Sequence, residues 1–457
     1  MTAVNWANPY ARRRGRWLKG NLHTHTREGS ACAQMSLAEA LARYAKLGYD
    51  FLCLSNHMSL TAPRHRRLLF LPGLEWNSPA GEHATVCAFE PSLLRRCIRT
   101  ADQPALLSRL DGQEAIVVLN HPNWCEPAHY TREQLLERKP ALGIEIYNAV
   151  IERLPGCALA TDKWDFLLSN GRPLLGFASD DAHRVEDIGQ GWIMVRAESR
   201  TPRAVARAIR EGNFYASTGV TIRDIRREGP VITVDTADAD AIWAVGAGGV
   251  RLAHTPGRRL VFDTSGLASP YVRFTAFGRG PAMAWTQPFF LGTPPAQGDV
   301  SPFVTRWRMS RLEPHRLGNA PAAGPDSALD WRPVEAQASP KGFVCATRYH
   351  DHQDGVVYFT NRFAVSRAAD WVVSLGHDGG AALFADGQRV LFQPRRINPA
   401  RPDRSQARLR LTRGTHTLTV CLDTDHGLGQ GFFLRFIRPS DGGPGARRTD
   451  PFPRRLG

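Results

Sequence analysis

The sequence lacks two features that would place the chain in a membrane or in the secretory pathway. It has no run of about 18 apolar residues, which a membrane-spanning helix needs. The N-terminal stretch 1–17 contains arginines but no apolar segment behind them, unlike a secretory signal peptide. We therefore expect a cytoplasmic protein without a membrane span.

The sequence also has no C-x-x-C pair among its eight cysteines. Several cysteines stand inside apolar segments, such as Cys53 in "FLCLS" and Cys87 in "TVCAF". Thiols in such positions are typical of a buried core, whereas disulfide frameworks belong to small secreted domains. The pattern indicates reduced cysteines in a reducing compartment.

Acidic residues are fewer than basic ones, 43 against 58, and the formal net charge is +15. A positive charge favours anionic partners, among them phosphorylated small molecules. Apart from the cluster "ARRRGR" at 11–16, the arginines are dispersed, and no stripe combines basic and aromatic residues as in RNA-binding proteins. We expect a small anionic substrate and do not expect nucleic acid.

At 457 residues the chain is long enough for two or three domains. Short apolar segments alternate with helical patterns over 18–215, and the clearest helix lies within 36–48, where Ser36 and Glu39 form a capping box. Such alternation predicts parallel strands connected by helices, and this many units favours a barrel. The expected fold class is α/β, with a barrel domain at 1–220.

After residue 220 the pattern changes to short alternating strands without helices between them. The Pro- and Gly-rich stretch 318–333 is typical of a linker, and the tail 441–457 of a disordered end. We expect two all-β, sandwich-like modules at 221–317 and 334–440, the second jelly-roll-like. The segment "LGHDGGAALFADGQRV" in the second module looks like hairpins attached to sugar-active enzymes. Carbohydrate contact through this module is a hypothesis, and ordinary scaffold is the simpler interpretation.

Two histidines, His23 and His25, stand one residue apart after the apolar segment "RWLKGNL". Residues two apart on a strand share a face, so the two imidazoles could bind one divalent cation. One H-x-H taken alone is more often a pair of polar residues at a strand end. Other predicted strands carry similar residues at or near their ends, and the whole set is His23, His25, His57, Glu75, His83, His121, Asp181 and His183.

This repeated placement argues for a metal site. In a parallel α/β barrel the loops after the strands converge on one face and bring distant segments together. Only 15 of the 457 residues are His, so repeated strand ends with His, Asp or Glu are improbable by chance. Nitrogen and oxygen ligands without cysteine suit Zn, Mn or Fe.

The ordered segments "NLHTHT", "GYDFLCLSNH", "PGLEW", "LNHP", "IEIYN" and "SDDAHR" resemble the motifs of the PHP (polymerase and histidinol phosphatase) metallohydrolases. The resemblance covers about residues 18–220. The segment "GNFYASTG" and the β pattern behind it look like the subgroup in which a small β module follows the PHP domain. The resemblance implies a distorted seven-stranded (β/α) barrel that binds two or three divalent metals.

The resemblance also implies which residues bind each metal. The ligands of the first metal would be His23, His25, Glu75 and Asp181. Those of the second would be Glu75, His83 and His121, with Glu75 shared between the two metals. Those of the third would be His57 and His183.

Two positions depart from the family pattern. Asn56 stands where an Asp usually precedes the second-motif His, and "REGSAC" at 27–32 replaces the usual S-D-G. An amide is a poorer ligand than a carboxylate because it is neutral. We therefore expect the third metal position, near His57 and His183, to be the weakest.

The reaction that this site favours is phosphoester hydrolysis. Two close divalent cations lower the pKa of a bridging water, so hydroxide is available at neutral pH. Arg27 and Arg184 stand just after ligand positions and could bind phosphate oxygens bidentately. The alternatives are hydrolysis of carboxyl esters or carbamates by the same metals, and a non-catalytic glycan-binding protein whose barrel has decayed.

Two other polar groups in the β-rich part are weaker candidates. His350 and His352 form a second H-x-H, and Asp423, Asp425 and His426 stand close together in "CLDTDHG". Both groups lie beside turn residues, so we interpret them as solvated loops.

Overall fold

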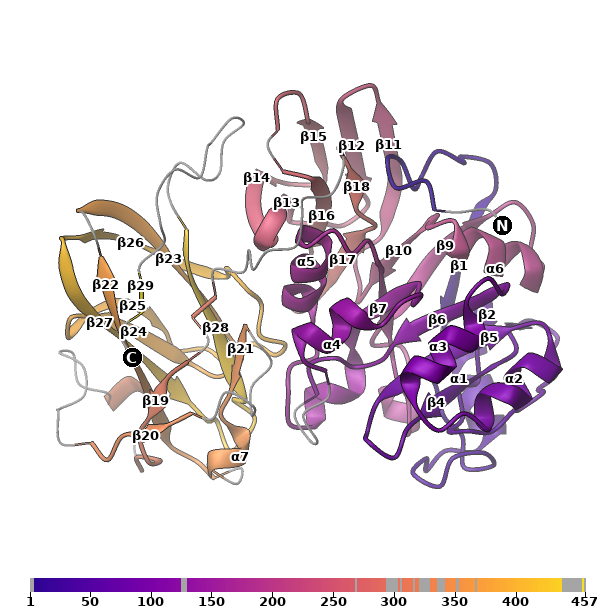
Figure 1. Ribbon diagram of the computed structural model, residues 1–457, viewed down its shortest axis with the longest axis horizontal. Coiled ribbons are helices and arrows are strands. Elements are labelled where there is room, and N and C mark those ends of the chain that lie inside the picture. The colour runs from indigo at the N-terminus through magenta and orange to yellow at the C-terminus, as the bar shows by residue number, and fades with distance from the viewer. Residues whose placement is uncertain are drawn as a thin grey trace. The chain divides into compact units, whose positions relative to one another are not determined.

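The computed structural model describes most of the chain, and Figure 1 labels its elements. The described residues are 4–124, 130–267, 269–292, 303–304, 306–314, 317–319, 329–334, 342–350, 353–365, 368–437 and 454–455. The predicted tail 441–457, apart from the short strand β29 (Arg454–Arg455), lies outside them. Residues 320–328 of the predicted linker do so as well.

The chain divides into two compact units. The first consists of Met1–Pro122, Arg132–Val150 and Trp164–Asp299, and the second of Asn123–Thr131, Ile151–Lys163 and Val300–Gly457. Every residue predicted to bind metal belongs to the first unit. The finer division into modules at residues 220 and 317 stays a prediction.

The larger sheet of the first unit has ten strands. Its strands in spatial order are β14 (Val250–Pro256), β13 (Ala241–Gly246), β16 (Tyr271–Phe277), β17 (Met283–Thr286), β10 (Phe214–Ser217), β9 (Trp192–Ala197), β1 (Arg16–Asn21), β2 (Phe51–Leu52) and β3 (Leu69–Phe70), with β18 (Phe289–Phe290) beside β16. The pairs β1–β2 and β2–β3 are parallel, and β9 is antiparallel to β1. Strands from both sides of residue 220 thus form one continuous sheet.

A second sheet of the first unit has five strands. They are β4 (Gly73–Asn77), β5 (His83–Ala88), β6 (Ala115–Leu119), β7 (Gly143–Asn148) and β8 (Leu175–Ser179). The pairs β6–β7 and β7–β8 are parallel, whereas β5 is antiparallel to both of its neighbours. Every residue of β7 and β8 is buried, as expected for parallel strands covered on both faces.

Two single parallel bridges join these sheets. Thr24, after β1, pairs with Ala182, after β8, and His57, after β2, pairs with Glu75 in β4. The prediction of a mixed α/β fold with many β-strands is confirmed. The closed seven-stranded barrel stays a prediction, because the described strands pair as two sheets connected by these bridges.

The helices of the first part of the chain alternate with strands or groups of strands along the sequence, and Figure 1 labels them. They are α1 (Leu37–Lys46), α2 (Pro91–Ile98), α3 (Gln103–Leu110), α4 (Arg132–Glu137), α5 (Thr161–Ser169) and α6 (Pro202–Arg210), with short 3-10 segments η1 (Ala149–Arg153) and η2 (Val185–Asp187). The predicted capping box of α1 is present, since Ser36 Oγ accepts from the Glu39 N–H and the Glu39 carboxylate accepts from the Ser36 N–H. This cap fixes the start of the first helix after the H-x-H loop.

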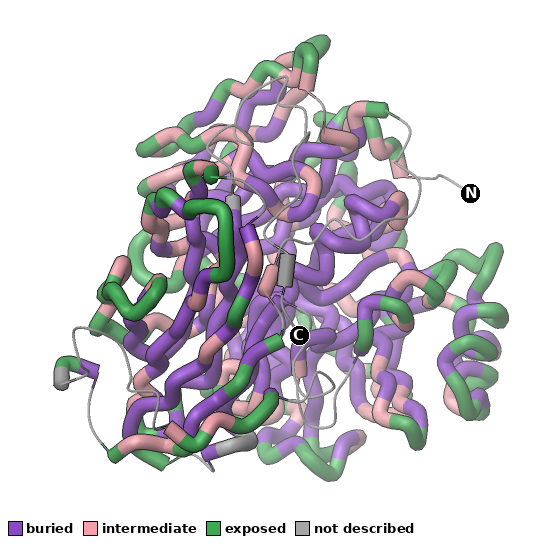
Figure 2. The backbone as a smooth tube through the Cα atoms, turned by 60° about the vertical axis from the view of Figure 1, so that its left-hand side comes forward, coloured by how far each residue is buried: buried purple, intermediate pink, exposed green. Residues whose placement is uncertain are grey.

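Apolar side chains of α6 pack against strands of the ten-stranded sheet. Val205 and Ile209 of this helix share one buried cluster with Phe51, Val195 and Phe214. Figure 2 shows the strands mostly buried and the loops between elements mostly exposed. The core therefore lies under the strands that lead to the predicted site.

The chain after residue 220 adds the small sheet β11 (Ile222–Glu228), β12 (Val231–Thr236) and β15 (Arg259–Asp263). A residue of this part of the chain, Gln287, also contacts strand β8 directly. The side chain of Gln287 accepts from the Gly176 N–H at 2.8 Å and donates to the Gly176 carbonyl at 2.9 Å. β8 leads to Asp181, so this contact helps to fix the strand on which the site depends.

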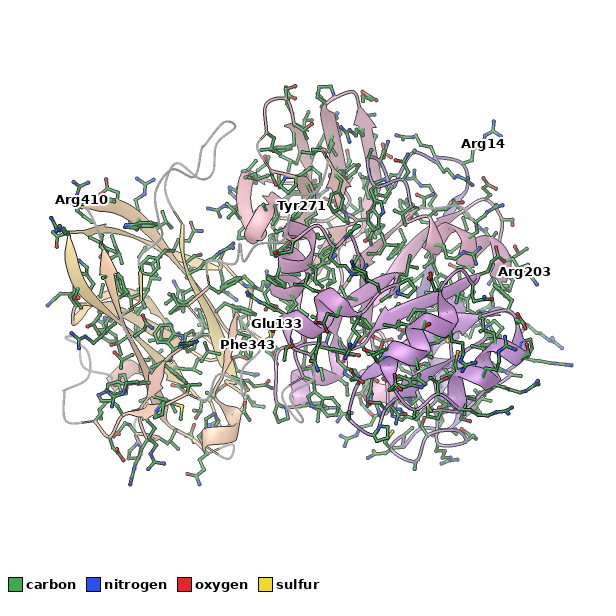
Figure 3. The ribbon with its side chains drawn as sticks, in the orientation of Figure 1. Arg14, Glu133, Arg203, Tyr271, Phe343 and Arg410 are labelled. Carbon is green, nitrogen blue, oxygen red and sulfur yellow. The ribbon has the colours of Figure 1, made fainter. Side chains whose placement is uncertain are left out.

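A buried ion pair connects α5 with β16. The Asp165 carboxylate accepts from Arg273 Nε at 2.7 Å and from Arg273 Nη2 at 2.6 Å. Tyr271, labelled in Figure 3, donates its hydroxyl to the same carboxylate at 2.9 Å. Both charged side chains are almost fully buried, so each depends on the other for compensation.

The second unit consists mainly of two sheets. The larger sheet contains β20 (Arg332–Pro333), β19 (Arg308–Met309), β22 (Val356–Val365), β27 (Gly414–Asp423), β24 (Ala381–Ala385) and β25 (Gln388–Gln393), with β29 beside β22. The smaller sheet contains β21 (Phe343–Cys345), β28 (Gly431–Ile437), β23 (Ala369–His377) and β26 (Ser405–Leu411). The short helix α7 (Thr347–His350) and the 3-10 segment η4 (Leu317–Asn319) are also part of this unit.

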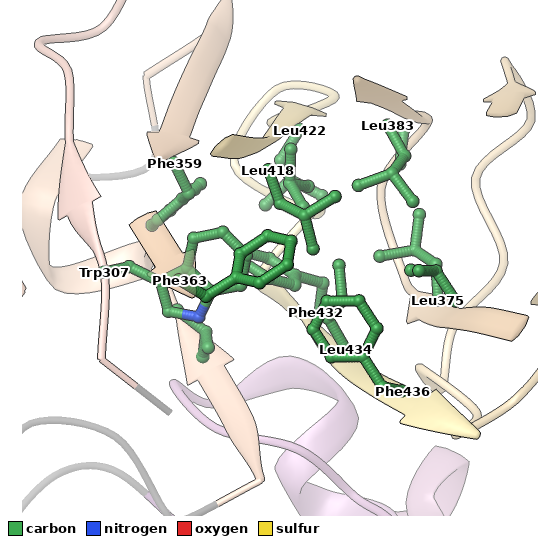
Figure 4. Packing of buried hydrophobic residues seen from close by; sticks show 14 of the residues in the cluster. Trp307, Phe359, Phe363, Leu375, Leu383, Leu418, Leu422, Phe432, Leu434 and Phe436 are labelled. Carbon is green, nitrogen blue, oxygen red and sulfur yellow. The ribbon is translucent and has the colours of Figure 1, made fainter. Parts of the chain in front are cut away.

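Residues from both sheets form one buried apolar cluster in the second unit. Phe359 and Leu418 belong to the larger sheet, and Phe432 and Leu434 to the smaller one (Figure 4). Two sheets that share such a core are typical of a β-sandwich. The β-rich character predicted for this part of the chain is confirmed.

Candidate metal centre

The structure brings all eight predicted metal-binding residues together at one end of the strands. His83 shows why: it starts β5, which runs antiparallel to β6, so it lies at the end where β6 leads to His121. Possible ligand atoms within 4.8 Å of one another form the groups His25–His57–His183, His23–His25–Asp181, His23–Glu75–His121 and His57–Glu75–His83. Six strands (β1, β2, β4, β5, β6 and β8) and the residues next to them thus contribute to one cluster.

Glu75 lies at the centre of this cluster and is 1% exposed. Both of its carboxylate oxygens are close to imidazole nitrogens. These distances are 3.2 Å to His23 Nε2, 3.2 Å to His25 Nε2, 3.0 Å to His57 Nδ1, 3.0 Å to His83 Nδ1 and 3.3 Å to His121 Nε2. Glu75 is therefore the residue best placed to be shared between metal ions.

Asp181 is the second carboxylate of the cluster. Its Oδ1 lies 3.1 Å from Nε2 of both His23 and His25. The imidazole Nδ1 of His183 contacts the Asp181 carbonyl at 2.7 Å, which leaves Nε2 of His183 for another partner. Asp181 thus completes a group with the two histidines of the H-x-H motif.

The spacing of these atoms agrees with metal coordination. Two ligands at about 2.1 Å from one ion, separated by angles of roughly 90° to 109°, lie about 3.0 to 3.4 Å apart. The distances from the Glu75 oxygens to the five imidazole nitrogens are 3.0 to 3.3 Å. The donor set therefore has a suitable size for divalent ions.

Two buried nitrogens of the cluster also point to a cation. Nε2 of His23 and Nδ1 of His57 have no hydrogen-bond partner among the residues that the structure describes. Nε2 of His23 nevertheless lies within 3.2 Å of the Glu75 carboxylate. A nitrogen lone pair is repelled by a carboxylate at this distance unless a proton or a metal ion lies between them.

The pKa shifts show the same competition for positive charge. Burial acts to lower the pKa of His23, but Asp181, Glu75 and Glu145 together raise it well above its ordinary value. Burial acts to raise the pKa of Glu75, but His23 and His83 outweigh it and hold that pKa well below its ordinary value. The carboxylates stay ionised and attract cations, and a divalent ion would replace the protons on the imidazoles.

The pKa values of His57 and His183 shift in the opposite direction to that of His23. Burial lowers the pKa of His57 to about 4, and burial also lowers the pKa of His183. Both imidazoles are therefore neutral at pH 7. Neutral imidazole is the form that binds metal ions.

Backbone conformation is unusual around the cluster. His121, Asp181 and Met58, the neighbour of His57, have positive φ angles of 28°, 49° and 49°. Residues other than glycine rarely adopt such angles, and they concentrate at functional sites. The fold therefore holds two of the predicted ligands in conformations that a free chain would avoid.

Glu145 is a buried residue of the site that the sequence analysis did not assign. It lies in β7, and its carboxylate contacts His23 Nδ1 at 2.8 Å and the His121 N–H at 2.7 Å. The segment "IEIYN" contained the signal, because Glu145 is the one charged residue in a fully buried strand. Such a residue needs a polar partner.

Asp180, next to Asp181, closes the loop that carries His183. Its Oδ1 accepts from the successive N–H groups of Gly189, Gln190 and Gly191 at 2.7 to 3.0 Å. Burial raises the pKa of Asp180 to about 6, although these three N–H groups favour the ionised form. The contacts fix both ends of the segment that holds Asp181 and His183.

Asn56, the first departure from the family pattern, has a clear structural role. Its Oδ1 accepts from the Thr26 N–H at 2.8 Å and from the Ser30 hydroxyl at 3.0 Å. Its Nδ2 donates to Thr61 Oγ1 at 2.8 Å. The amide thus fixes the loop after the H-x-H motif.

Arg27 and Arg184 are both exposed next to the cluster in sequence. The Arg27 N–H donates to the Met35 carbonyl, and the Arg184 N–H donates to the Asp187 carboxylate, so the backbone of each is fixed. Their role in binding phosphate stays a prediction. So does the assignment of each ligand to a particular metal.

The groups that the sequence analysis set aside do not join a second cluster. Among the described residues, every group of three or more candidate ligands belongs to the cluster around Glu75 and its neighbours. Asp425 pairs with Arg396, and the His426 N–H donates to Asp354. His352 lies outside the described residues.

No helix in the described part of the chain is long and apolar enough to cross a membrane.

One known protein family has a model that matches part of this chain. The model of a family described as PHP-associated matches residues 168–214, the region from the end of α5 to β10. No curated protein matches the chain. This match supports the resemblance to the PHP family that the motifs around the metal centre indicated.

Several solved structures are also similar. A two-domain protein containing a predicted PHP-like metal-dependent phosphoesterase from Bacteroides vulgatus is 15% identical, with 58% of this chain and 94% of that chain covered and a TM-score of 0.36. PsfC from Pseudomonas syringae is 14% identical, with 42% and 88% covered and a TM-score of 0.33. A lesion-specific endonuclease from Pyrococcus furiosus is 11% identical, with 43% and 56% covered and a TM-score of 0.34. Since all three TM-scores are below 0.5, the resemblance to the PHP family rests on the PHP-associated match and on the chain's own motifs.

Proposed function

We propose that this protein is a metal-dependent hydrolase that cleaves a phosphoester bond in a small phosphorylated substrate. The observation that carries the proposal is the approach of five imidazole nitrogens to the two oxygens of one buried carboxylate, Glu75. Asp181 adds a second carboxylate to the same cluster. Such a set binds two or three divalent ions, for which Zn, Mn and Fe are suitable.

Each group of residues has a distinct task in this proposal. His23, His25 and Asp181 hold one ion together with Glu75, and His83 and His121 hold the second. Divalent ions at these positions would supply a water acidic enough to attack phosphorus at neutral pH and would balance the negative charge that develops. The buried surroundings of Glu75 and Asp181 strengthen these electrostatic interactions.

Arg27 and Arg184 are proposed to bind phosphate oxygens of the substrate. Both are exposed and stand close in sequence to ligand positions, and this supports the proposal. A guanidinium matches two phosphate oxygens at once. The net charge of +15 would also attract an anionic substrate.

The reaction type can be tested with three model substrates. The protein loaded with Mn²⁺ or Zn²⁺ is mixed with nitrophenyl phosphate, nitrophenyl acetate or a nitrophenyl carbamate, and Asp181→Asn is the matched control. We expect turnover of the phosphate that depends on metal and is lost in the variant. Turnover of the acetate or carbamate alone would assign a carboxyl-ester or carbamate hydrolase instead. Protein that holds metal but cleaves none of the three would favour a non-catalytic role, and a panel of phosphorylated metabolites would then decide.

We also propose that the protein works in a reducing compartment. Cys32, Cys53, Cys87, Cys97, Cys157 and Cys421 are free thiols, and this supports a reducing compartment such as the cytoplasm. We retain the prediction that nucleic acid is not the substrate. We also retain carbohydrate contact through the second unit as a hypothesis.

A further inference from the structure

Glu145 is buried in the metal centre but belongs to none of its candidate ligand groups, among the residues that the structure describes. It lies in β7, two residues before Tyr147 and three before Asn148, in a strand whose side chains are all buried. A carboxylate in such a place is costly unless its oxygens are hydrogen-bonded. The hydrogen bonds of Glu145 therefore show how its burial is compensated.

Four donors surround the two oxygens of Glu145. Oε1 contacts Nδ1 of His23 at 2.8 Å and accepts from the Ser179 hydroxyl. Oε2 accepts from the His121 N–H at 2.7 Å and from Nδ2 of Asn148 at 2.8 Å. An ionised carboxylate accepts only, and about four donors satisfy it. Glu145 is thus saturated by donors and has no oxygen left for a metal ion.

The contact with His23 fixes the state of that imidazole. Because Glu145 only accepts, Nδ1 of His23 must carry the hydrogen in this bond. Nε2 then presents its lone pair, and this is the nitrogen that lies 3.2 Å from Glu75 and 3.1 Å from Asp181. The carboxylate behind His23 therefore selects the form of the ring that can bind a metal ion.

The contact with His121 involves its backbone N–H and fixes the backbone conformation of that residue, not its imidazole ring. His121 has a φ of 28°, which a non-glycine residue rarely adopts. The charged hydrogen bond from its N–H to Glu145 stabilises this conformation. In it, Nε2 of His121 lies 3.3 Å from Glu75.

We propose that Glu145 is a positioning residue that prepares one ligand of each of two metal sites, His23 for the first and His121 for the second. The inference rests on the proposed metal binding but does not depend on which bond is hydrolysed. It differs from a general structural role, because replacement of Glu145 should weaken both metal sites together. A residue that merely fills space would affect folding without this coupling.

The test is a metal titration of Glu145→Gln with Ser179→Ala as the matched control. Gln has the size of Glu, but its amide nitrogen is a donor. It would face either His23 and Ser179 or His121 and Asn148, which are donors as well. Ser179→Ala removes another donor to the same carboxylate oxygen and leaves the contacts with His23 and His121 in place. Calorimetry with Mn²⁺ or Zn²⁺, combined with elemental analysis, gives the affinity and number of ions without a hydrolysis assay.

We expect Glu145→Gln to weaken the two tightest metal equivalents together, each by about 10- to 100-fold. Ser179→Ala should change both by less than about threefold. Unchanged affinities in Glu145→Gln, or the loss of one equivalent alone, would overturn the proposal. A wild-type protein that binds two ions but hydrolyses no ester would refute the proposed function and leave this inference standing.

A second measurement covers the case in which Glu145→Gln does not fold. Nitrogen NMR of the wild-type protein loaded with Zn²⁺ reports which imidazole nitrogen of each histidine carries hydrogen once the ion has replaced the other proton. We expect Nδ1 of His23 to be protonated and hydrogen-bonded. An Nε2–H form of His23 with Nδ1 lacking hydrogen would overturn the role assigned to Glu145.

Discussion

The side chain of Asn56 occupies the space that a methyl group on Gly29 would need. A Cβ atom on Gly29 would lie 2.4 Å from Nδ2 and 2.6 Å from Cγ of Asn56. Asn56 also holds Thr26 and Ser30 on either side of this glycine. The two departures from the family pattern, Asn56 and the segment 27–32, therefore form one structural unit.

Gly29→Ala should weaken the metal centre through this unit. The added methyl group displaces the Asn56 amide or the loop, and Ser30 then loses its 3.1 Å contact with Nδ1 of His25. We expect metal affinity and turnover to fall by about tenfold, as for other changes next to a ligand. Gly292→Ala is the control, since nothing lies within 4 Å of its added methyl group. Equal metal titrations for both variants would contradict the role of the Asn56–Gly29 contact.

The sequence identified the histidines because each follows or starts a recognisable strand. It did not identify the role of Glu145 or Asn56. Both are polar residues whose partners come from other segments, such as His121 for Glu145 and Ser30 for Asn56. Residue type and spacing predict which face a side chain occupies, but the partner across the sheet depends on the tertiary fold.

Asn56→Asp tests the expectation that the third metal position is the weakest. The hydroxyl of Thr61 can turn to donate to a carboxylate, so the Asp can keep the contacts of the amide. The added negative charge lies next to His57 and would attract a divalent ion there. We expect about tenfold tighter binding of the weakest equivalent in calorimetry. Three full sites of equal affinity in the wild type, unchanged by the Asp, would show that Asn56 does not limit metal binding.

The prediction of β structure after residue 220 came from alternating apolar residues, which report the local conformation. The same pattern does not reveal that β10 pairs with β17, with Tyr215 opposite Thr286. Nor does it reveal that Asp165 and Arg273, 108 residues apart, form a buried ion pair. Such long-range pairs depend on complementary surfaces and not on the period of the sequence.

Arg273→Met should strongly destabilise the first unit. The change leaves the Asp165 carboxylate buried without its cation, which costs about 3–5 kcal/mol of unfolding free energy. The double variant Arg273→Met with Asp165→Leu removes both charges and should recover most of this loss. Urea unfolding of the three proteins gives the comparison. A single variant as stable as the wild type would show that the pair contributes little.

The stability of the second unit should depend on pH through Asp378. Burial raises the pKa of Asp378 from 3.8 to about 7, although N–H groups of Gly379, Gly431 and Gln430 favour the ionised form. The folded state therefore holds a proton that the unfolded state releases, and stability falls as pH rises from about 4 towards 7. Between pH 5 and pH 7 this carboxyl alone should cost about 2 kcal/mol.

Asp378→Asn should remove this dependence. The amide oxygen can still accept from the N–H groups of Gly379 and Gly431, which lie 2.8 Å from Oδ1 in the wild type. Urea unfolding at pH 5, 6 and 7 should show the variant gaining about 2 kcal/mol over the wild type across this range. Asp370→Asn is the control in β23, the strand that leads to Asp378, because Asp370 is exposed and pairs with the exposed Arg410. If the difference between wild type and Asp378→Asn is the same at all three pH values, Asp378 stays ionised in the folded protein and its three N–H partners outweigh its burial.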